Sequence, residues 1–148
     1  MTTRYGSTFT GTFADGTVPP AKVDGGRNTA KMRKIVEVFD LSAATFASGD
    51  LLYLGRLPTG AYFDGVRLTG SVSMGGTATI AIGSVASPAK YRAAATFTAV
   101  DTPTSFGPAA ALAQAALTAP EDVYATIAAA NLPASGTLVV EINYRVAA

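Results

Sequence analysis

The chain has 148 residues, of which 49% are hydrophobic and only 14% are charged, and its net charge is +1. This length suits a single domain with a core of its own. Because charged residues normally make up roughly 25% of a protein, we expect a surface that is rich in small apolar residues or covered in an assembly. Cysteine and histidine are both absent. Their absence excludes disulfides, cysteine nucleophiles, Ser-His-Asp triads and the usual zinc sites.

Residues 1–34 differ from the rest of the chain. They hold six of the eleven basic residues and two of the ten acidic ones, so a positive segment precedes a slightly acidic body. Apolar residues are sparse there and cannot close a core. The sequence therefore predicts an extended basic arm over 1–34 and a folded domain over 35–148. The arm is either a solvated leader or a segment that orders against a partner, and in the second case its anchors are Tyr5, Phe9, Phe13, Arg27, Lys31 and Arg33.

The targeting signals that composition can reveal are missing. No run reaches the ~18 apolar residues of a membrane span, and the polar start MTTRYGSTFTG lacks the apolar centre of a signal peptide. We expect synthesis in the cytoplasm and no membrane partner. The basic residues are diluted by Thr and Gly, whereas nucleic-acid tails carry denser runs, so we do not expect nucleic acid as a partner either.

The folded part reads as a series of strands. Residues 34–41 form the first, and 50–83 hold three apolar runs divided by Pro58–Gly60 and by Gly75-Gly76. In the middle run Val66 and Leu68 share one parity and polar residues the other, which is the period of a half-buried strand. A Gly-Gly pair between two alternating runs is a hairpin signal, so we expect 50–83 to be an antiparallel meander.

The second half continues the pattern. Residues 90–97 form a weak strand, and 123–129 and 137–146 form two clear ones, with a turn at 132–136. Residues 101–120 read as a loop whose Ala-rich stretch, 109–117, has helix propensity but little length. Seven or eight short strands with little helix predict an all-β protein, an antiparallel β-sandwich of jelly-roll type.

The sequence offers no chemical site. It has no phosphate-binding loop and no calcium loop. Glu121 and Asp122 read as a solvated turn and Asp64 as a bulge residue beside Gly65, and Asp64 could act with Asp101 only if the two converge. The aromatic residues that could stack on a sugar read as core instead: Tyr62, Phe63, Tyr91 and Phe97. We therefore predict no catalytic, cofactor or metal site and no enzymatic activity.

Three segments carry a resemblance to a known class of proteins. They read LPTGAYFDGVRLTGSVSMGGTATIAIGS, SPAKYRAAATFTAVDTPTSFG and LTAPEDVYATIAAANLPASGTLVVEINY. In their small-apolar strands and LPxG turns they resemble the small virion proteins of tailed bacteriophages that decorate or cement the capsid, over roughly residues 31 to 146. The resemblance implies a β-sandwich on the capsid surface, commonly a trimer, whose arm runs over neighbouring subunits.

Three readings of the function follow. The first is a non-enzymatic virion protein that binds the major capsid protein, and further copies of itself as a trimer, and so stabilises the head. The alternatives are a carbohydrate-binding or adhesion sandwich of a fibre, which the absence of Trp disfavours, and a head-tail or tail component.

Overall fold

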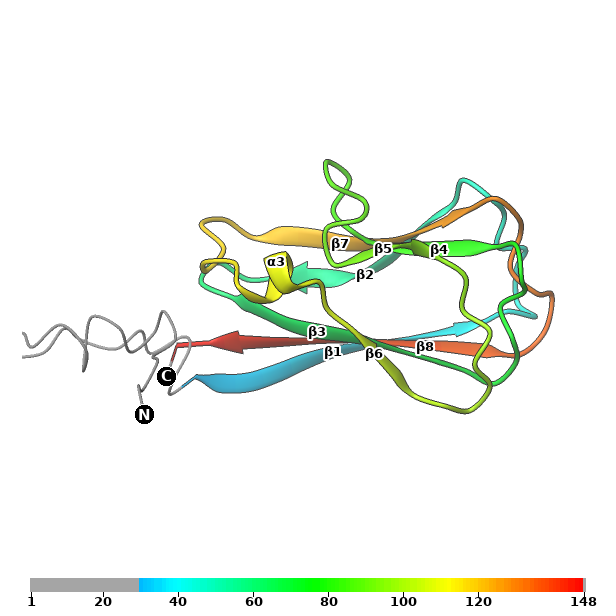
Figure 1. Ribbon diagram of the computed structural model, residues 1–148, viewed down its shortest axis with the longest axis horizontal. Helices are drawn as coiled ribbons and strands as arrows, with labels where there is room; N and C mark the ends of the chain where they lie inside the picture. Colours follow the sequence, from blue (N-terminus) through cyan, green and yellow to red (C-terminus); the bar gives the residue numbers. More distant parts are fainter. Residues whose placement is uncertain (1–29, 148) are drawn as a thin grey trace, which may run out of the picture.

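The computed structural model describes residues 30–147, which fold into two four-stranded antiparallel sheets packed face to face (Figure 1). One sheet has the order β1-β8-β3-β6 and the other the order β2-β7-β4-β5. The strands are β1 (Lys31–Asp40), β2 (Leu51–Leu57), β3 (Tyr62–Gly70), β4 (Thr79–Gly83), β5 (Arg92–Ala95), β6 (Thr104–Phe106), β7 (Glu121–Ala128) and β8 (Thr137–Val146). A four-residue helix, α3 (Ala109–Leu112), lies at the margin between the layers (Figure 1). The prediction of an all-β sandwich is confirmed.

The strand pairing has the pattern of a jelly roll. β1 pairs with β8, β2 with β7, β3 with β6 and β4 with β5, all antiparallel. The chain is therefore one long hairpin whose tip lies between β4 and β5. Lateral pairing of β3 with β8 and of β4 with β7 rolls this hairpin into two sheets, as in double-sheet jelly rolls.

Alternating side chains build the core between the sheets. On β8 Leu138, Val140 and Ile142 are buried, and on β7 Val123, Ala125 and Ile127 are buried, as the period-2 pattern predicts. From the middle of β3, Val66 and Leu68 point into the same core and are fully buried. Because these side chains meet residues from both sheets in one cluster, the described part of the chain has a single core.

The predicted meander over 50–83 is wrong, although its strands exist. β2 and β4 lie in one sheet and β3 lies in the other, so neither connection is a hairpin. The chain leaves β3 at Gly70, where a β-carbon would lie 2.8 Å from both the Met74 side chain and the Val72 carbonyl oxygen. It then crosses to the second sheet, with Met74 buried on the way. The alternation of apolar residues past Gly70 thus reflects burial in a crossover and not a continued ladder.

Three boundaries also differ from the prediction. β1 begins at Lys31 and pairs with β8 from there, so residues 31–34, which the sequence placed in the arm, belong to the sandwich. The loop at 101–120 contains the three-residue strand β6, which is too short to show an alternating pattern in the sequence. Of the Ala-rich stretch 109–117, only Ala109–Leu112 is helical.

Candidate interaction surfaces

The six predicted anchor residues divide between two parts of the chain. Tyr5, Phe9, Phe13 and Arg27 lie outside the described residues. Lys31 and Arg33 lie in the first half of β1, where both are exposed. Neither forms an ion pair with another described residue. The structure therefore presents these two cations on an edge strand and not on a separate segment.

The carboxylates that the sequence singled out do not form a catalytic pair. Asp64 lies next to the bulge at Gly65 near the start of β3, as predicted. The backbone N–H of Asp101 donates to the carbonyl oxygen of Gly70, the last residue of β3, at 2.8 Å. At about 3.3 Å per residue, roughly 20 Å of strand separates the two positions. A hydrolase built on these two acids is therefore not supported.

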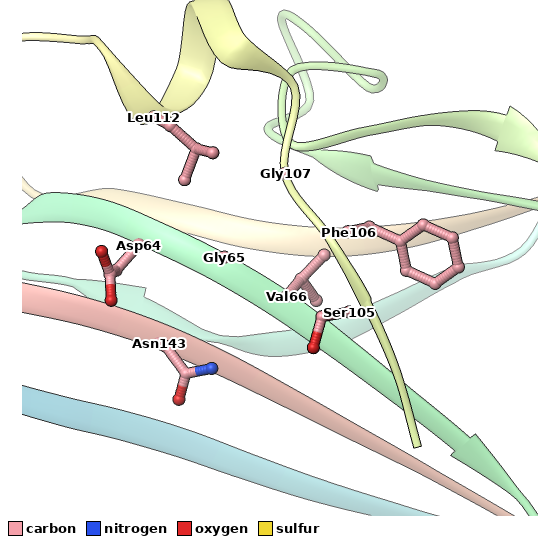
Figure 2. Close-up of a pocket in the computed structure, with 8 residues that line it drawn as sticks. All are labelled: Asp64, Gly65, Val66, Ser105, Phe106, Gly107, Leu112 and Asn143. Atoms are coloured by element: carbon pink, nitrogen blue, oxygen red, sulfur yellow. The ribbon is translucent and has the colours of Figure 1, made fainter. Parts of the chain in front are cut away.

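A shallow pocket of about 250 Å³ lies beside Asp64 on the margin of the first sheet (Figure 2). Its walls come from β3, β6, β8 and α3, and Leu112 of α3 closes one side. Figure 2 shows the carboxylate of Asp64 and the amide of Asn143 on one side, with the ring of Phe106 pointing away from them. Arg145 Nε lies 3.5 Å from the Asp64 carboxylate. The ion-paired carboxylate of Asp64, the amide of Asn143 and the hydroxyl of Ser105 can bind a polar side chain. The pocket lacks a second acid or base for general acid–base chemistry.

Glu121 and Asp122 are paired, which corrects the prediction of a solvated turn. Glu121 accepts from Lys90 Nζ at 2.7 Å and from the hydroxyl of Tyr91. Asp122 accepts from Arg56 Nε at 2.8 Å and Arg56 Nη2 at 3.0 Å, and this bidentate pair lowers the pKa of Asp122. Both acids fix the start of β7 to its surroundings, so neither is available for chemistry. No group of three or more metal-ligating side chains occurs among residues 30–147.

Most of the aromatic residues considered for stacking are core, as predicted. Phe63, Tyr91 and Phe97 are buried, and the rings of Phe63 and Tyr91 stack at 4.2 Å between centroids. A pair that the sequence did not single out, Tyr53 and Tyr124, lies on the outer face of the second sheet at 5.5 Å and 62°. Because these two rings meet edge to face, they do not offer a flat platform to a sugar.

A charged cluster crosses three strands on the outer face of the first sheet. Glu141 of β8 is 8% exposed. It accepts from Arg67 of β3 and, at 2.9 Å, from Lys34 Nζ of β1. The hydrogen bonds from Arg67 and then Lys34 hold the pKa of Glu141 below its usual range. The cluster therefore stabilises the order β1-β8-β3 while Glu141 is ionised, and it leaves few free charges at the centre of this face.

A buried arginine connects the two sheets where β5 of one lies beside β6 of the other. Arg92 of β5 is 3% exposed, and its guanidinium lies over the ring of Phe106 of β6 at 4.3 Å. It donates to the carbonyl oxygens of Ala95 at 3.1 Å and Thr96 at 3.2 Å, and to that of Ile80. Burial lowers the pKa of Arg92. No sequence signal marks this residue, because its acceptors are main-chain carbonyls.

Exposed apolar side chains gather on the first two strands. Of the eight large hydrophobic side chains that are exposed in the described part, three lie on β1 and two on β2. They are Met32, Val36, Val38, Leu51 and Tyr53. The three on β1 lie on the outer face of the first sheet and the two on β2 lie on the outer face of the second, so they form two small groups and not one patch. Exposed apolar groups of this kind can contact other proteins.

The comparisons with known proteins agree with this picture. No protein-family model and no curated protein matches the sequence. The fold, however, matches chains of bacteriophage capsids. One is in the capsid of Ralstonia phage GP4, with a TM-score of 0.60 and 22% identity over 92% of this chain and 96% of that one.

Two further capsid chains match with similar TM-scores. In the cyanophage Pam1 capsid asymmetric unit the TM-score is 0.61 with 20% identity, over 90% of this chain and 95% of the capsid chain. In the acid-stable capsid of Helicobacter pylori bacteriophage KHP30 it is 0.58 with 16% identity, over 79% and 89%. At this identity the likeness establishes a shared fold. No helix among residues 30–147 is long and apolar enough to cross a membrane.

Proposed function

We propose that this protein is a non-enzymatic component of a bacteriophage head that binds the lattice of the major capsid protein and stabilises it from the capsid surface. The observation that carries the proposal is the coverage of the capsid chains. The match spans nearly all of this chain and nearly all of the GP4 and Pam1 chains. Those chains are therefore small polypeptides of about the same length, each made of this fold, as a decoration or cement protein would be.

The chemistry of the described surface supports an adhesive role. The acids near β7 and β8 are occupied by basic partners, and the pocket beside Asp64 has a single carboxylate. The exposed apolar residues of β1 and β2 provide contact area instead. Many copies on one shell make individually weak contacts effective through multivalency. We further propose that the protein assembles as a trimer, since a low-charge body is suited to contacts with its own copies.

The basic segment supplies a second part of the proposal. Residues 1–34 carry a positive charge and scattered aromatic residues, which suits attachment to an acidic or apolar strip on a neighbouring subunit. We assign attachment to Tyr5, Phe9, Phe13, Arg27, Lys31 and Arg33. The last two contribute from β1, so attachment on this proposal extends from the basic segment onto the edge of the sandwich.

The test is reassembly on capsids. Head particles formed from the major capsid protein of the same genome are incubated with the full chain, sedimented and quantified for bound protein and for melting temperature. We expect saturable binding and a higher melting temperature. A full chain that stays in the supernatant refutes the function. Replacing Tyr5, Phe9 and Phe13 together by Ala should reduce occupancy, while Val85→Ala is the control, because this exposed side chain lies outside β1, β2 and the basic segment. Unchanged occupancy in the triple variant refutes the assignment of the anchors alone.

A fibre or tail component remains the competing function. The pair Tyr53–Tyr124 offers no flat platform, but Tyr53 is itself exposed, and a single exposed tyrosine can contact a sugar ring, which is the one observation that favours sugar binding. A glycan array with purified full chain decides between the two. One reproducible glycan hit that Tyr53→Ala abolishes, together with no binding to head particles, would replace the capsid proposal.

A further inference from the structure

The four edge strands of the sandwich are not equally protected against pairing with another chain. Open edges invite association, and natural proteins blunt them with short strands, bulges or prolines. β6 has three residues and β5 has four. β2 has seven, with a register shift between Tyr53 and Gly55. Only β1, among the edges in the described part, is both long and regular: it pairs with β8 over all ten residues without a shift and contains no proline.

Every second residue of β1 directs its backbone N–H and C=O groups toward the free edge of the sheet. Beyond the end of the strand, the Leu41 N–H donates to the Gly136 carbonyl oxygen at 2.9 Å. This bond continues the β1–β8 ladder, so the odd-numbered residues of β1 direct their main-chain groups toward β8. The even-numbered residues direct theirs to the free edge: Met32, Lys34, Val36 and Val38. Three of these four side chains are apolar and 46–60% exposed.

The charge pattern of β1 fits an antiparallel copy of itself. The first half carries Lys31, Arg33 and Lys34, and the second half carries Glu37 and Asp40. An antiparallel partner with the same sequence opposes the basic half of each strand to the acidic half of the other. Residues 1–30 hold three basic and two widely separated acidic residues, so they offer no acidic half that could oppose the basic half of β1. The charges therefore favour a second copy of β1 over an arm as the occupant.

Geometry then fixes the register. A two-fold axis normal to the sheet keeps each side chain on its own face, so only residues of equal parity can lie opposite each other. With the axis at Lys34 or Glu37, like charges meet, and at Val36, Met32 would oppose Asp40. With the axis at Ile35, Arg33 opposes Glu37 of the second copy and Met32 opposes Val38. We propose that two copies join through β1 in this register, so that their first sheets form one continuous eight-stranded sheet.

The proposal goes beyond the proposed function and does not depend on it, because it concerns two copies of this chain alone. The even-numbered residues would supply about eight backbone hydrogen bonds across the axis. Such a contact is isologous, so it pairs copies and leaves the other edges free. If the protein is also a trimer, the β1 contact would link a subunit of one trimer to a subunit of the next.

The test uses single cysteines, since the natural chain has none. In the proposed register position 35 faces itself across a non-hydrogen-bonded pair, where the Cα atoms lie about 4.5 Å apart, within the range that a disulfide requires. Full-length Ile35→Cys should form a covalent dimer on mild oxidation. The matched control is Val38→Cys, whose two copies would lie about 20 Å apart along the strands. We expect at least tenfold faster cross-linking at position 35. Equal rates, or no product from folded Ile35→Cys protein, overturn the register.

Two further variants keep the proposal testable if Ile35→Cys does not fold. In Val36→Pro the lost N–H points to the free edge, so the β1–β8 ladder should persist while pairing is blocked. Sedimentation velocity should then show loss of the self-associated species with unchanged circular dichroism. Arg33→Glu should weaken association at least tenfold, and Arg33→Glu combined with Glu37→Arg should restore it. Association that survives Val36→Pro, or a double variant as weak as the single one, overturns the proposal.

Discussion

Arg92 of β5 lies against Phe106 of β6 in the other sheet, and replacing it tests how much this connection contributes to stability. Arg92→Ala removes a buried guanidinium that donates to the Ala95 and Thr96 carbonyl oxygens at 3.1 and 3.2 Å. Hydrogen bonds from charged donors contribute about 1.5–3 kcal/mol each, so these two represent about 3–6 kcal/mol. Part of this is offset because the variant no longer buries a charge. We expect a net loss of about 2–4 kcal/mol, which is a large share of the 5–15 kcal/mol typical of a domain.

The assay is urea unfolding followed by circular dichroism. At a slope of about 2 kcal/mol per molar urea, the middle of the usual range, the midpoint should fall by about 1–2 M. Arg92→Lys should recover only part of the loss, since an ammonium cannot reproduce the fork or the stacking on Phe106. Arg56→Ala is the control, because this exposed arginine should matter far less. An Arg92→Met variant as stable as the natural protein would refute the reasoning, since it would mean that burying the charge costs as much as its bonds contribute.

Three other outcomes follow from the described contacts. For Glu141 the folded pKa is lowered, so its stabilisation is present above the unfolded value of about 4.3 and is lost as pH falls through the folded value. Glu141→Gln should therefore be less stable than the natural chain at pH 7 and should lose less on acidification, measured as melting temperature between pH 7 and 3. Gly83→Ala should lower the free energy of unfolding by more than about 2 kcal/mol, since the new β-carbon would lie 2.1 Å from the backbone oxygen of Ser87. Gly75→Ala should cost only about 1–2 kcal/mol, because the new β-carbon would meet open space and only the φ of +96° is unfavourable. Equal urea midpoints for Gly83→Ala and Gly75→Ala would contradict this prediction. Leu68→Asp should abolish folding, because the side chain is fully buried, whereas Thr69→Ala should leave the circular dichroism spectrum and any assembly intact.

Residue periodicity predicted the strands well because each central strand has one face in the core. β7 and β8 were predicted within two residues of their bounds, since alternation alone defines them. Periodicity carries no information on which strands become neighbours. Gly75-Gly76 therefore looked like a hairpin, although the chain turns away at Gly70 and crosses to the other sheet.

The surfaces were harder to predict than the core. Arg92 gave no signal because its partners are carbonyl groups, which every residue has. Lys31 and Arg33 were assigned to an arm, because three of the first four residues of β1 are basic and neither parity is apolar there. Which strands lie at the edges of the sheets, and which of these edges is the longest and most regular, is known only once the strand order is known.

The rolled hairpin also has a consequence for the order of events in the cell. β1 finds its partner β8 only when nearly the whole described chain exists, since Lys31 pairs with Val146. Pairings that are this distant in sequence make folding slow, and the earliest strand must wait, unpaired, until the last one has left the ribosome. A chain interrupted before β8 would lack a central strand of the first sheet and expose the apolar core. Synthesis of β8 thus acts as a checkpoint, because only a chain that includes this strand can join β1 to β3 and close the first sheet over the core.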